Sequence, residues 1–198
     1  NVKLIEIDID CVNFLKIKFA PIDVIHADFL HFKFEEKKFK NSVLIGNFPY
    51  NISSQIIFKV LENRDCFIEI VGMFQKEVAE RICSPPKSKK YGILSVLSQA
   101  YFTCEKLFDV GPENFQPKPK VNSSVIRLIR KNKIDCDYKQ FKKVVKESFS
   151  QRRKKLKNAL KNLTILNGVN LNAFGELRAE ELDVRDFIKL TNKLFPNS

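Results

Sequence analysis

Residues 47–50, Asn-Phe-Pro-Tyr, are the group in this chain whose side chains are best suited to chemistry. An amide oxygen accepts hydrogen bonds, a proline fixes a backbone turn, and an aromatic ring stacks on a flat substrate. The group follows the apolar run 43–45, and the serines at 53–54 can cap a following helix. A short apolar run between breakers predicts a buried strand of a parallel sheet. Because the functional crevice of open α/β sheets lies at the carboxyl ends of the strands, we predict a site for a planar, hydrogen-bonding substrate here.

The same four residues are also typical of a simple turn. Asparagine tolerates the left-handed region, proline sets φ, and tyrosine packs down onto the strand. The tetrapeptide alone leaves the turn and the substrate site as alternatives of equal weight, so the surrounding segments have to decide between them.

Those segments resemble one enzyme family. The stretch 46–53, GNFPYNIS, resembles motif IV of the adenine-N6 methyltransferases, (N/D)-x-P-(Y/F), and is most similar to that of the ribosomal RNA adenine dimethyltransferases of the KsgA type. Seven further segments resemble this branch in the same order. They are IEID (5–8), HADFLHF (26–32), MFQKEVAERI (73–82), SKKYGILSV (88–96), FQPKPKVNSSVIRL (115–128), FSQRRKKLKNAL (149–160) and RAEELDVRDFIKLTNKL (178–194). The resemblance covers essentially all 198 residues.

The resemblance implies a catalytic group at residues 47–50. The side-chain oxygen of Asn47 and the backbone carbonyl of Phe48 would hold the amino hydrogens of an adenine, and Pro49 would fix the turn. Tyr50 and Phe115 would sandwich the extruded base. Asn47 would also contact the cofactor.

The cofactor implied by the resemblance is S-adenosyl-L-methionine. Glu6, at the end of a predicted strand, is expected to accept the ribose hydroxyls, with Asp8 as the alternative and Ile7 beside it. Asp28 is expected to accept the adenine amino group, because a neutral exocyclic amine needs an oxygen acceptor, and Phe29 to pack on the ring.

The order of elements predicts an α/β fold, a Rossmann-like class I methyltransferase sheet that is incomplete at its N-terminal side, followed by a small all-α domain. Strands are predicted at 2–9, 23–28, 67–74, 107–110 and 123–129, and helices at 55–61, 75–82 and 92–102. Apolar residues repeat at helical spacing over 141–149 and 156–163, and Asp183 is placed to cap a final helix. The breaker-rich loop 84–90 fits a solvated connector and an RNA-contacting lid equally well. We assign residues 1–131 to the methyltransferase domain and 132–198 to a helical RNA-binding domain.

One segment of the family pattern is absent from the sequence. The family carries a strand that ends in a Gly-x-Gly loop, which holds the methionine end of the cofactor, whereas none of the six glycines here has that spacing. The absent strand would be the central one, so we expect two sheet halves that lack a shared hydrogen-bonding partner. We therefore expect a longer polypeptide. An intact mass near 23.0 kDa would refute that expectation.

Charge points to a polyanionic partner. The formal net charge is +12, and residues 139–161 contain ten Lys or Arg against one acid, Glu147. Such a segment is too lopsided for an ordinary salt-bridged face. Two lysines of the loop before the last strand are expected to meet phosphates as well. The predicted RNA-binding residues are Lys118, Lys120, Lys142, Lys143, Arg152, Arg153, Lys154 and Lys155.

Composition limits the class of protein to which the chain can belong. The apolar fraction of 44% indicates a globular protein, and no apolar run is long enough to span a bilayer. No signal-peptide pattern is present. The five cysteines show no metal-ligand spacing, and His26 and His31 are predicted to be bystanders, so we expect no metal and a reducing, cytoplasmic location.

The predicted function is S-adenosylmethionine-dependent N6-dimethylation of two adjacent adenines in a 3'-terminal hairpin of small-subunit (16S) ribosomal RNA. The expected partner is that RNA or the immature 30S particle, and a monomer is the expected state, with no membrane partner. Two alternatives stay open: a non-catalytic RNA-binding assembly factor on the same fold, and a large-subunit adenine methyltransferase that confers macrolide resistance.

Overall fold

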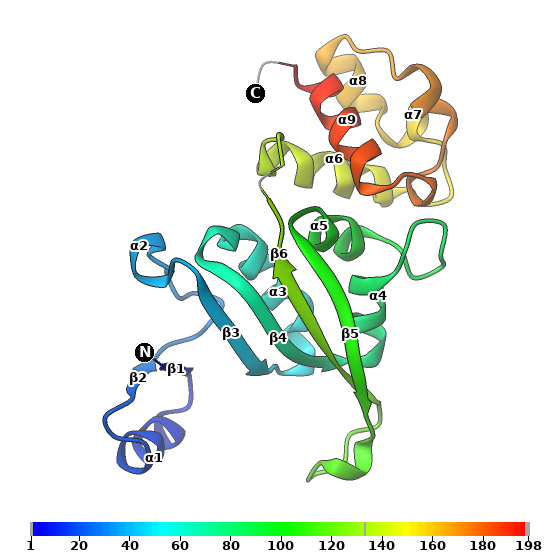
Figure 1. Ribbon diagram of the computed structural model, residues 1–198. Coiled ribbons are helices and arrows are strands. Elements are labelled where there is room, and N and C mark those ends of the chain that lie inside the picture. Colours follow the sequence, from blue (N-terminus) through cyan, green and yellow to red (C-terminus); the bar gives the residue numbers. More distant parts are fainter. Residues whose placement is uncertain (1, 133, 197–198) are drawn as a thin grey trace.

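The computed structural model describes residues 2–132 and 134–196. The chain begins with a small unit of β1 (Lys3–Glu6), α1 (Ile9–Lys18) and β2 (Asp23–His26), in which the two strands pair in parallel. Asp8 begins α1, because its carboxylate accepts hydrogen bonds from two backbone amides of the first turn. A short helix, α2 (Glu36–Phe39), then leads to the main sheet, which lies beside the first unit (Figure 1).

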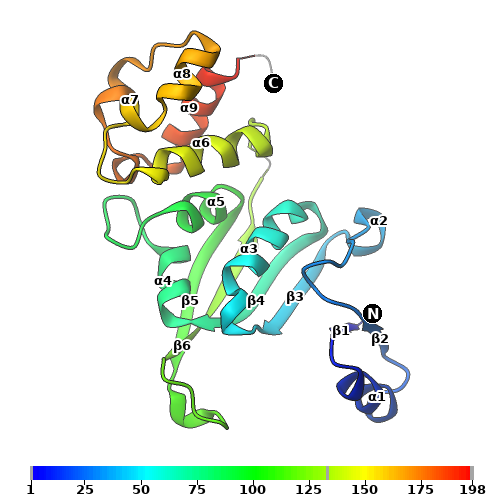
Figure 2. The same ribbon diagram turned by 180° about the vertical axis from the view of Figure 1, so that it is seen from behind.

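The main sheet has the strand order β3 (Ser42–Asn47), β4 (Phe67–Gln75), β6 (Ser123–Arg130) and β5 (Phe102–Val110). β3 and β4 are parallel, whereas β6 runs antiparallel to both β4 and β5. One face of this sheet is covered by α3 (Ser53–Glu62), α4 (Lys76–Cys83) and α5 (Ile93–Tyr101), which lie in front of the strands in Figure 2. Across the described residues, β1–β2 and the main sheet are not hydrogen-bonded to each other, which confirms the prediction of two separate sheet halves.

The last third of the chain is helical, as its spacing predicts. α6 (Tyr138–Ser150), α7 (Leu156–Ala159), α8 (Lys161–Asn167) and α9 (Val184–Leu194) form a cluster in which α6 and α9 pack against α5. The predicted cap of α9 is present, because a carboxylate oxygen of Asp183 accepts a hydrogen bond of 2.8 Å from the backbone amide of Asp186. This cluster lies at the opposite end of the sheet from the loop 111–122 (Figure 1).

The prediction that 43–45 forms a buried strand is wrong in part. β3 is an edge strand, and only the face that carries Leu44 packs onto the core, so Val43 and Ile45 are 51% and 75% exposed. Side chains of a strand alternate between the two faces of a sheet, and helices cover one face of this sheet (Figure 2), so the alternate residues of β3 meet solvent.

Other boundaries differ from the predicted ones. The helix predicted at 92–102 ends at Tyr101, because Phe102 has extended dihedral angles and begins β5. The helical segment 156–163 is broken at Leu160 into two short helices.

The helices α1 and α2 were not predicted. The division at residues 131 and 132 stays a prediction, since buried residues of both parts belong to one continuous apolar core. In the described part of the chain, no helix combines the length and the hydropathy that a membrane span requires.

Candidate active site

The turn after β3 is shaped by a ring that lies across two glycines. Gly46 of β3 and Gly72 of β4 are register partners, and a Cβ atom on either would lie 2.5 Å from the Phe48 ring. Phe48 is 8% exposed and also packs against Phe74, with ring centroids 5.1 Å apart. The buried ring thus anchors the turn to the sheet, while its neighbours Asn47 and Pro49 stay exposed.

Ser53 holds the other side of the turn. Its hydroxyl donates hydrogen bonds to the carbonyls of Pro49 and Tyr50, at 3.2 and 3.1 Å. The prediction that Ser53 caps α3 is therefore wrong, because Ser53 is the first residue of that helix and its side chain points back to the turn. The turn is fixed by a buried ring on one side and a buried hydroxyl on the other.

Two hydrogen-bond acceptors at the tip of β3 are free. Within residues 2–132 and 134–196, no group donates to the side-chain oxygen of Asn47 or to the carbonyl oxygen of Phe48. The amide of Phe48, by contrast, donates to the carbonyl of Met73 at 3.3 Å and so continues the β3–β4 ladder. The exposed tip therefore presents an amide oxygen and a peptide oxygen from consecutive residues.

These acceptors open onto a cleft of about 270 Å³. One wall is the turn, and the other is the loop 111–122 at the end of the β5–β6 hairpin. The lining residues are Asn47, Phe48, Pro49, Tyr50, Phe115, Gln116, Pro117 and Pro119. The structure therefore brings both residues of the predicted base sandwich, Tyr50 and Phe115, to the same cleft. Lys118 and Lys120 are carried by the same loop.

The predicted cofactor residues lie at the ends of β1 and β2. One carboxylate oxygen of Glu6 accepts hydrogen bonds from the amides of Ile7 and Asp8, at 2.7 and 2.9 Å. The other oxygen accepts from no group in the described residues, which leaves it for a ligand. Asp8 likewise uses one carboxylate oxygen, to cap α1, so hydrogen bonding does not separate the two acids, and the choice of Glu6 stays a prediction. The Ile7 side chain is 63% exposed.

Asp28 is engaged at both carboxylate oxygens. One accepts from the amide of Leu30 at 2.8 Å and the other from Nδ1 of His31 at 2.7 Å. The Leu30 amide, and then His31, lower the pKa of Asp28, so the group is a carboxylate acceptor at neutral pH. Phe29 reaches the turn after β3, with its ring centroid 6.3 Å from that of Phe48.

Both histidines form hydrogen bonds, although their predicted place as bystanders to the chemistry stays a prediction. His31 bonds to Asp28, and Nε2 of His26 donates to the carbonyl of Ile7 at 3.0 Å. Each histidine therefore supports one of the two loops that carry the predicted cofactor residues. The sequence signal for these contacts was the position of both histidines within three residues of Asp28.

The basic segment has more acidic partners than its sequence suggests. Lys142 pairs with Glu62 at 2.7 Å, Arg152 with Glu180 at 3.0 Å, and Lys155 with Glu176 at 2.7 Å. The expectation of an uncompensated face is wrong for these three, because the acids come from other elements. Arg152 also donates to the carbonyls of Ser88 and Lys89, and so ties the loop 84–90 to the helical cluster.

Three other cations of the predicted RNA-binding set in this segment form no ion pair with any described residue. For Lys143, Arg153 and Lys154, no acidic partner lies within bonding distance in any part of the chain that the structure describes. These residues are the members of the predicted RNA-binding set best placed to meet phosphates. Residues 2–132 and 134–196 also contain no group of three or more His, Cys, Asp or Glu that could hold a metal.

The comparison with known proteins agrees with this arrangement. The family model for ribosomal RNA adenine dimethylase matches residues 1–194. The chain belongs to the ribosomal RNA adenine dimethylase family. Its relatives in this family include the ribosomal RNA small subunit methyltransferase A of Cytophaga hutchinsonii, which is 48% identical over 98% of this chain and 77% of that protein. The protein of the same name from Flavobacterium johnsoniae is 46% identical over 98% of this chain and 76% of that protein.

Solved structures show the same fold. The crystal structure of a dimethyladenosine transferase from Plasmodium falciparum is 28% identical, with a TM-score of 0.78 over 96% of this chain and 80% of that one. The 23S rRNA methyltransferase ErmE has a TM-score of 0.65 at 23% identity, over 98% of this chain and 82% of that one, a likeness that shows the fold alone. The predicted α/β methyltransferase fold is thereby confirmed.

Sequence reasoning did not find every residue that shapes this candidate site. Gly72 carries no motif signal, because its importance arises only when β4 pairs with β3. Ser123 lies within a segment that resembles the family, but nothing in the sequence links it to Tyr50. Structure was needed for both.

Proposed function

We propose that this chain transfers methyl groups to N6 of two adjacent adenines in a 3'-terminal hairpin of small-subunit (16S) ribosomal RNA. Membership of the dimethylase family supports this function, and so do relatives named ribosomal RNA small subunit methyltransferase A. The observation that carries the proposal is the pair of free acceptors, on Asn47 and Phe48, at the mouth of an aromatic cleft.

The chemistry requires a better nucleophile than free adenine provides. The lone pair of the exocyclic nitrogen is delocalised into the ring, so the amine attacks poorly. The Asn47 side-chain oxygen and the Phe48 carbonyl would each accept one amino hydrogen and draw the nitrogen out of the ring plane, which localises the lone pair. Because the alkylated amine is acidic while it is positive, it can release its proton to solvent, and no strong base is needed. Catalysis is then positioning and electrostatics.

The base must leave its stack to reach these acceptors. Tyr50 and Phe115 would hold it between them in the cleft. The cleft volume of about 270 Å³ is just below the range of about 300–1,000 Å³ that is typical of sites for drug-sized ligands, as suits a single flat base. Stacking on aromatic side chains is worth about 1–3 kcal/mol per base, which offsets much of the unstacking cost of a few kcal/mol.

S-adenosyl-L-methionine is the proposed cofactor, and the residues present fit its nucleoside part. Glu6 keeps one carboxylate oxygen available for the ribose hydroxyls, and Asp28 is held as a carboxylate that can accept from the adenine amino group. Phe29 offers a ring face beside the Phe48 turn, and Asn47 lies at the junction of the two sites. The cofactor supplies the electrophilic methyl group. These residues would orient it toward the tip of β3.

The proposed partner is the small-subunit RNA, either free or in the immature 30S particle. Lys118 and Lys120 lie near the cleft, and Lys143, Arg153 and Lys154 lie in the helical domain, which we place at residues 132–198. Lys142, Arg152 and Lys155 would contribute less to RNA binding than the sequence predicts, since each is held by an acid. A monomer that acts in the cytoplasm fits this role.

A non-catalytic assembly factor on the same fold is the alternative to the enzyme. Such a factor would bind small-subunit RNA through the same surface without methyl transfer. The intact Asn-Phe-Pro-Tyr group and the two carboxylates support the enzyme instead.

The decisive experiment measures radiolabelled methyl transfer from S-adenosylmethionine to unmethylated small subunits by the full-length gene product. We expect transfer by the wild type and none by Asn47→Ala, with RNA affinity nearly unchanged in the variant. Asn162→Ala, at an exposed position in α8, is the matched control and should behave as the wild type. RNA binding without transfer by the wild type would support the assembly factor. A loss of RNA binding in Asn47→Ala, with transfer intact, would contradict the role given to Asn47.

A further inference from the structure

The two walls of the base cleft are joined by one side-chain hydrogen bond. The hydroxyl of Tyr50, on the turn after β3, bonds to the hydroxyl of Ser123. Ser123 is fully buried and is the first residue of β6, directly after the loop that carries Phe115. The bond therefore connects the ring on one wall to the base of the other wall, across 73 residues of sequence.

Ser123 lies in a part of the hairpin that is paired on both sides. It pairs with Gln75 of β4 on one side and with Val110 of β5 on the other. Val110 and Ser123 are thus the two ends of the loop, and they are held in register with each other. The backbone amide of Lys76 also donates to the carbonyl of Asn122 at 2.9 Å, which fixes the last residue of the loop.

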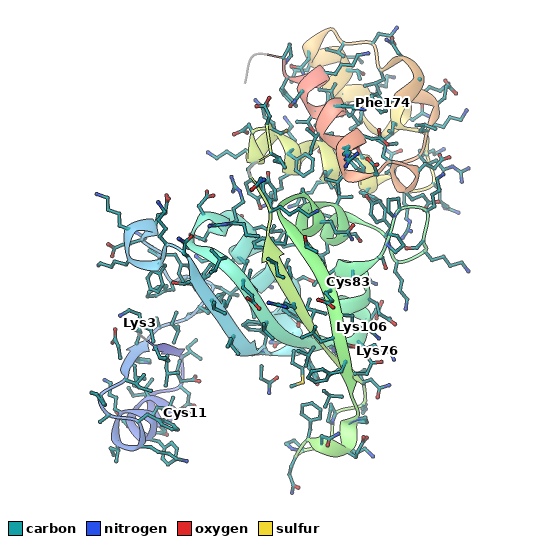
Figure 3. The ribbon with its side chains drawn as sticks, viewed as in Figure 1. Lys3, Cys11, Lys76, Cys83, Lys106 and Phe174 are labelled. Carbon is teal, nitrogen blue, oxygen red and sulfur yellow. The ribbon has the colours of Figure 1, made fainter. Side chains whose placement is uncertain are left out.

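An ion network reinforces this base. The hydroxyl of Ser124 donates to a carboxylate oxygen of Asp109 at 2.6 Å, and Lys76 and Lys106 reach the same carboxylate at 2.8 and 3.1 Å. These three donors hold the pKa of Asp109 far below its usual value, so the network is charged at every physiological pH. Figure 3 shows Lys76 and Lys106 near each other at the end of the hairpin that leads into the loop.

A stacking ring works only if its face is held toward its partner. The Tyr50 side chain is half-buried, and its hydroxyl would be free to swing if Ser123 did not hold it. Fixing the ring before the base arrives removes an ordering cost from binding, which is the general advantage of preorganisation. We propose that Ser123 is a positioning residue, which holds the Tyr50 ring toward Phe115 and so keeps the cleft open to a flipped base. This inference rests on the proposed function, because it concerns the same cleft.

The alternative is that the bond only stabilises the fold, by giving the buried Ser123 hydroxyl a hydrogen-bond partner. The two explanations differ in what a hydroxyl deletion changes. A structural role predicts a lower melting temperature with an unaltered cleft. A positioning role predicts a change in how the base is held, which can be read optically.

The test uses the full-length gene product with 2-aminopurine at the target adenine of a ribosomal hairpin, since this base fluoresces strongly when it leaves the stack. A methyl-transfer assay under single-turnover conditions runs in parallel. The variants are Ser123→Ala, Ser123→Thr, Tyr50→Phe and the double variant Ser123→Ala/Tyr50→Phe. The matched control is Ser98→Ala, which removes a buried hydroxyl that has no hydrogen-bond partner among the described residues.

We expect Ser123→Ala to lower the fluorescence rise and the single-turnover rate by roughly threefold to tenfold, the range that one ordinary hydrogen bond accounts for. Ser123→Thr should restore both signals, because it keeps the hydroxyl. Tyr50→Phe should match Ser123→Ala, and the double variant should be no worse than either single variant, because both remove the same bond.

Three results would overturn the inference. They are a Ser123→Ala variant indistinguishable from Ser98→Ala in fluorescence, additive effects in the double variant, and a lowered melting temperature with unchanged fluorescence. If the wild type transfers no methyl group, the proposed function fails, but the fluorescence comparison still tests Ser123 on bound RNA.

Discussion

Replacing Gly46 by alanine tests whether the Phe48 ring is what holds the turn after β3 in place. The three atoms nearest to a Cβ added at this position all belong to Phe48, at 2.5, 2.7 and 3.0 Å. Contacts under about 3 Å force a displacement, and Phe48 cannot move freely because it is 8% exposed and packs between the rings of Phe29 and Phe74. Overpacking of this kind costs about 1–3 kcal/mol.

The expected result is a lower melting temperature and a larger loss of activity. For a chain of this length each kcal/mol shifts the melting temperature by about 2–4 °C, so Gly46→Ala should lower it by roughly 2–12 °C. Moving Phe48 also moves its carbonyl, and a misplacement of about 1 Å can cost about 100-fold in rate. We therefore expect methyl transfer to fall by roughly tenfold to 100-fold.

Two variants make the reasoning refutable. Gly175→Ala is the matched control, because a Cβ there meets only ordinary contacts at 3.5 Å and the melting temperature should stay unchanged. In a Phe48→Leu background the cost of Gly46→Ala should shrink, since leucine lacks the two ring atoms that lie nearest, Cε1 and Cζ. Thermal unfolding followed by circular dichroism measures each of these proteins. An equal cost of Gly46→Ala in both backgrounds would show that Phe48 is not the obstacle.

Three further outcomes are expected. Changing Arg153 and Lys154 to glutamine should reduce the slope of log affinity for RNA against log salt by roughly 1.4–1.8, for two phosphate contacts, and an unaltered slope in a filter-binding titration would contradict their role. Two lysine hydrogen bonds lower the pKa of Glu176 to about 2, below the roughly 4.3 of an unfolded chain, so its stabilising contribution is present above pH 4.3 and is lost as the pH falls toward 2. The difference in melting temperature between the wild type and Glu176→Gln should accordingly shrink over that window, and a constant difference would argue against the ion pairs. Burial raises the pKa of Cys104 to about 12, whereas Cys11 is exposed. Iodoacetamide at a pH of about 8 should therefore label Cys11 well before Cys104 in a time course followed by peptide mapping. The reverse order of labelling would contradict the burial of Cys104.

The sequence predicted most of the site because the site is built from short segments. Residues 47–50 follow a strand, as the apolar run before them indicates, and the acids at 6 and 28 follow two more strands. Parallel strands bring their carboxyl ends to one edge, so local patterns sufficed to place the acids at 6 and 28 near each other, while the contact of Phe29 with Phe48 brings that pair to the turn after β3. The helical cluster was predictable for a similar reason, because apolar residues repeated at a spacing of 3.6 indicate an amphipathic helix from the local sequence alone.

What the sequence could not predict depends on partners distant in the chain. The acids that neutralise Lys142, Arg152 and Lys155 come from α3 and from the region before α9, so a local count of charge overestimated the free basic surface. The exposed face of β3 follows from the one-sided cover of helices over the main sheet (Figure 2), which the apolar run 43–45 does not encode. The register between β3 and β4 likewise decides that Gly46 and Gly72 lie side by side under the Phe48 ring.

The direction of β6 sets a minimum size for the nucleic acid that can use the whole surface. Because β6 runs antiparallel to β4, the chain leaves the sheet at the end opposite the cleft, and the helical cluster lies beyond that end (Figure 1). The eight residues of β6 alone measure roughly 27 Å. The cleft and the helical cluster that carries the unpaired cations therefore lie at opposite ends of this strand (Figure 1). An oligonucleotide limited to the two target adenines would touch only the cleft, whereas a structured RNA can bridge both ends.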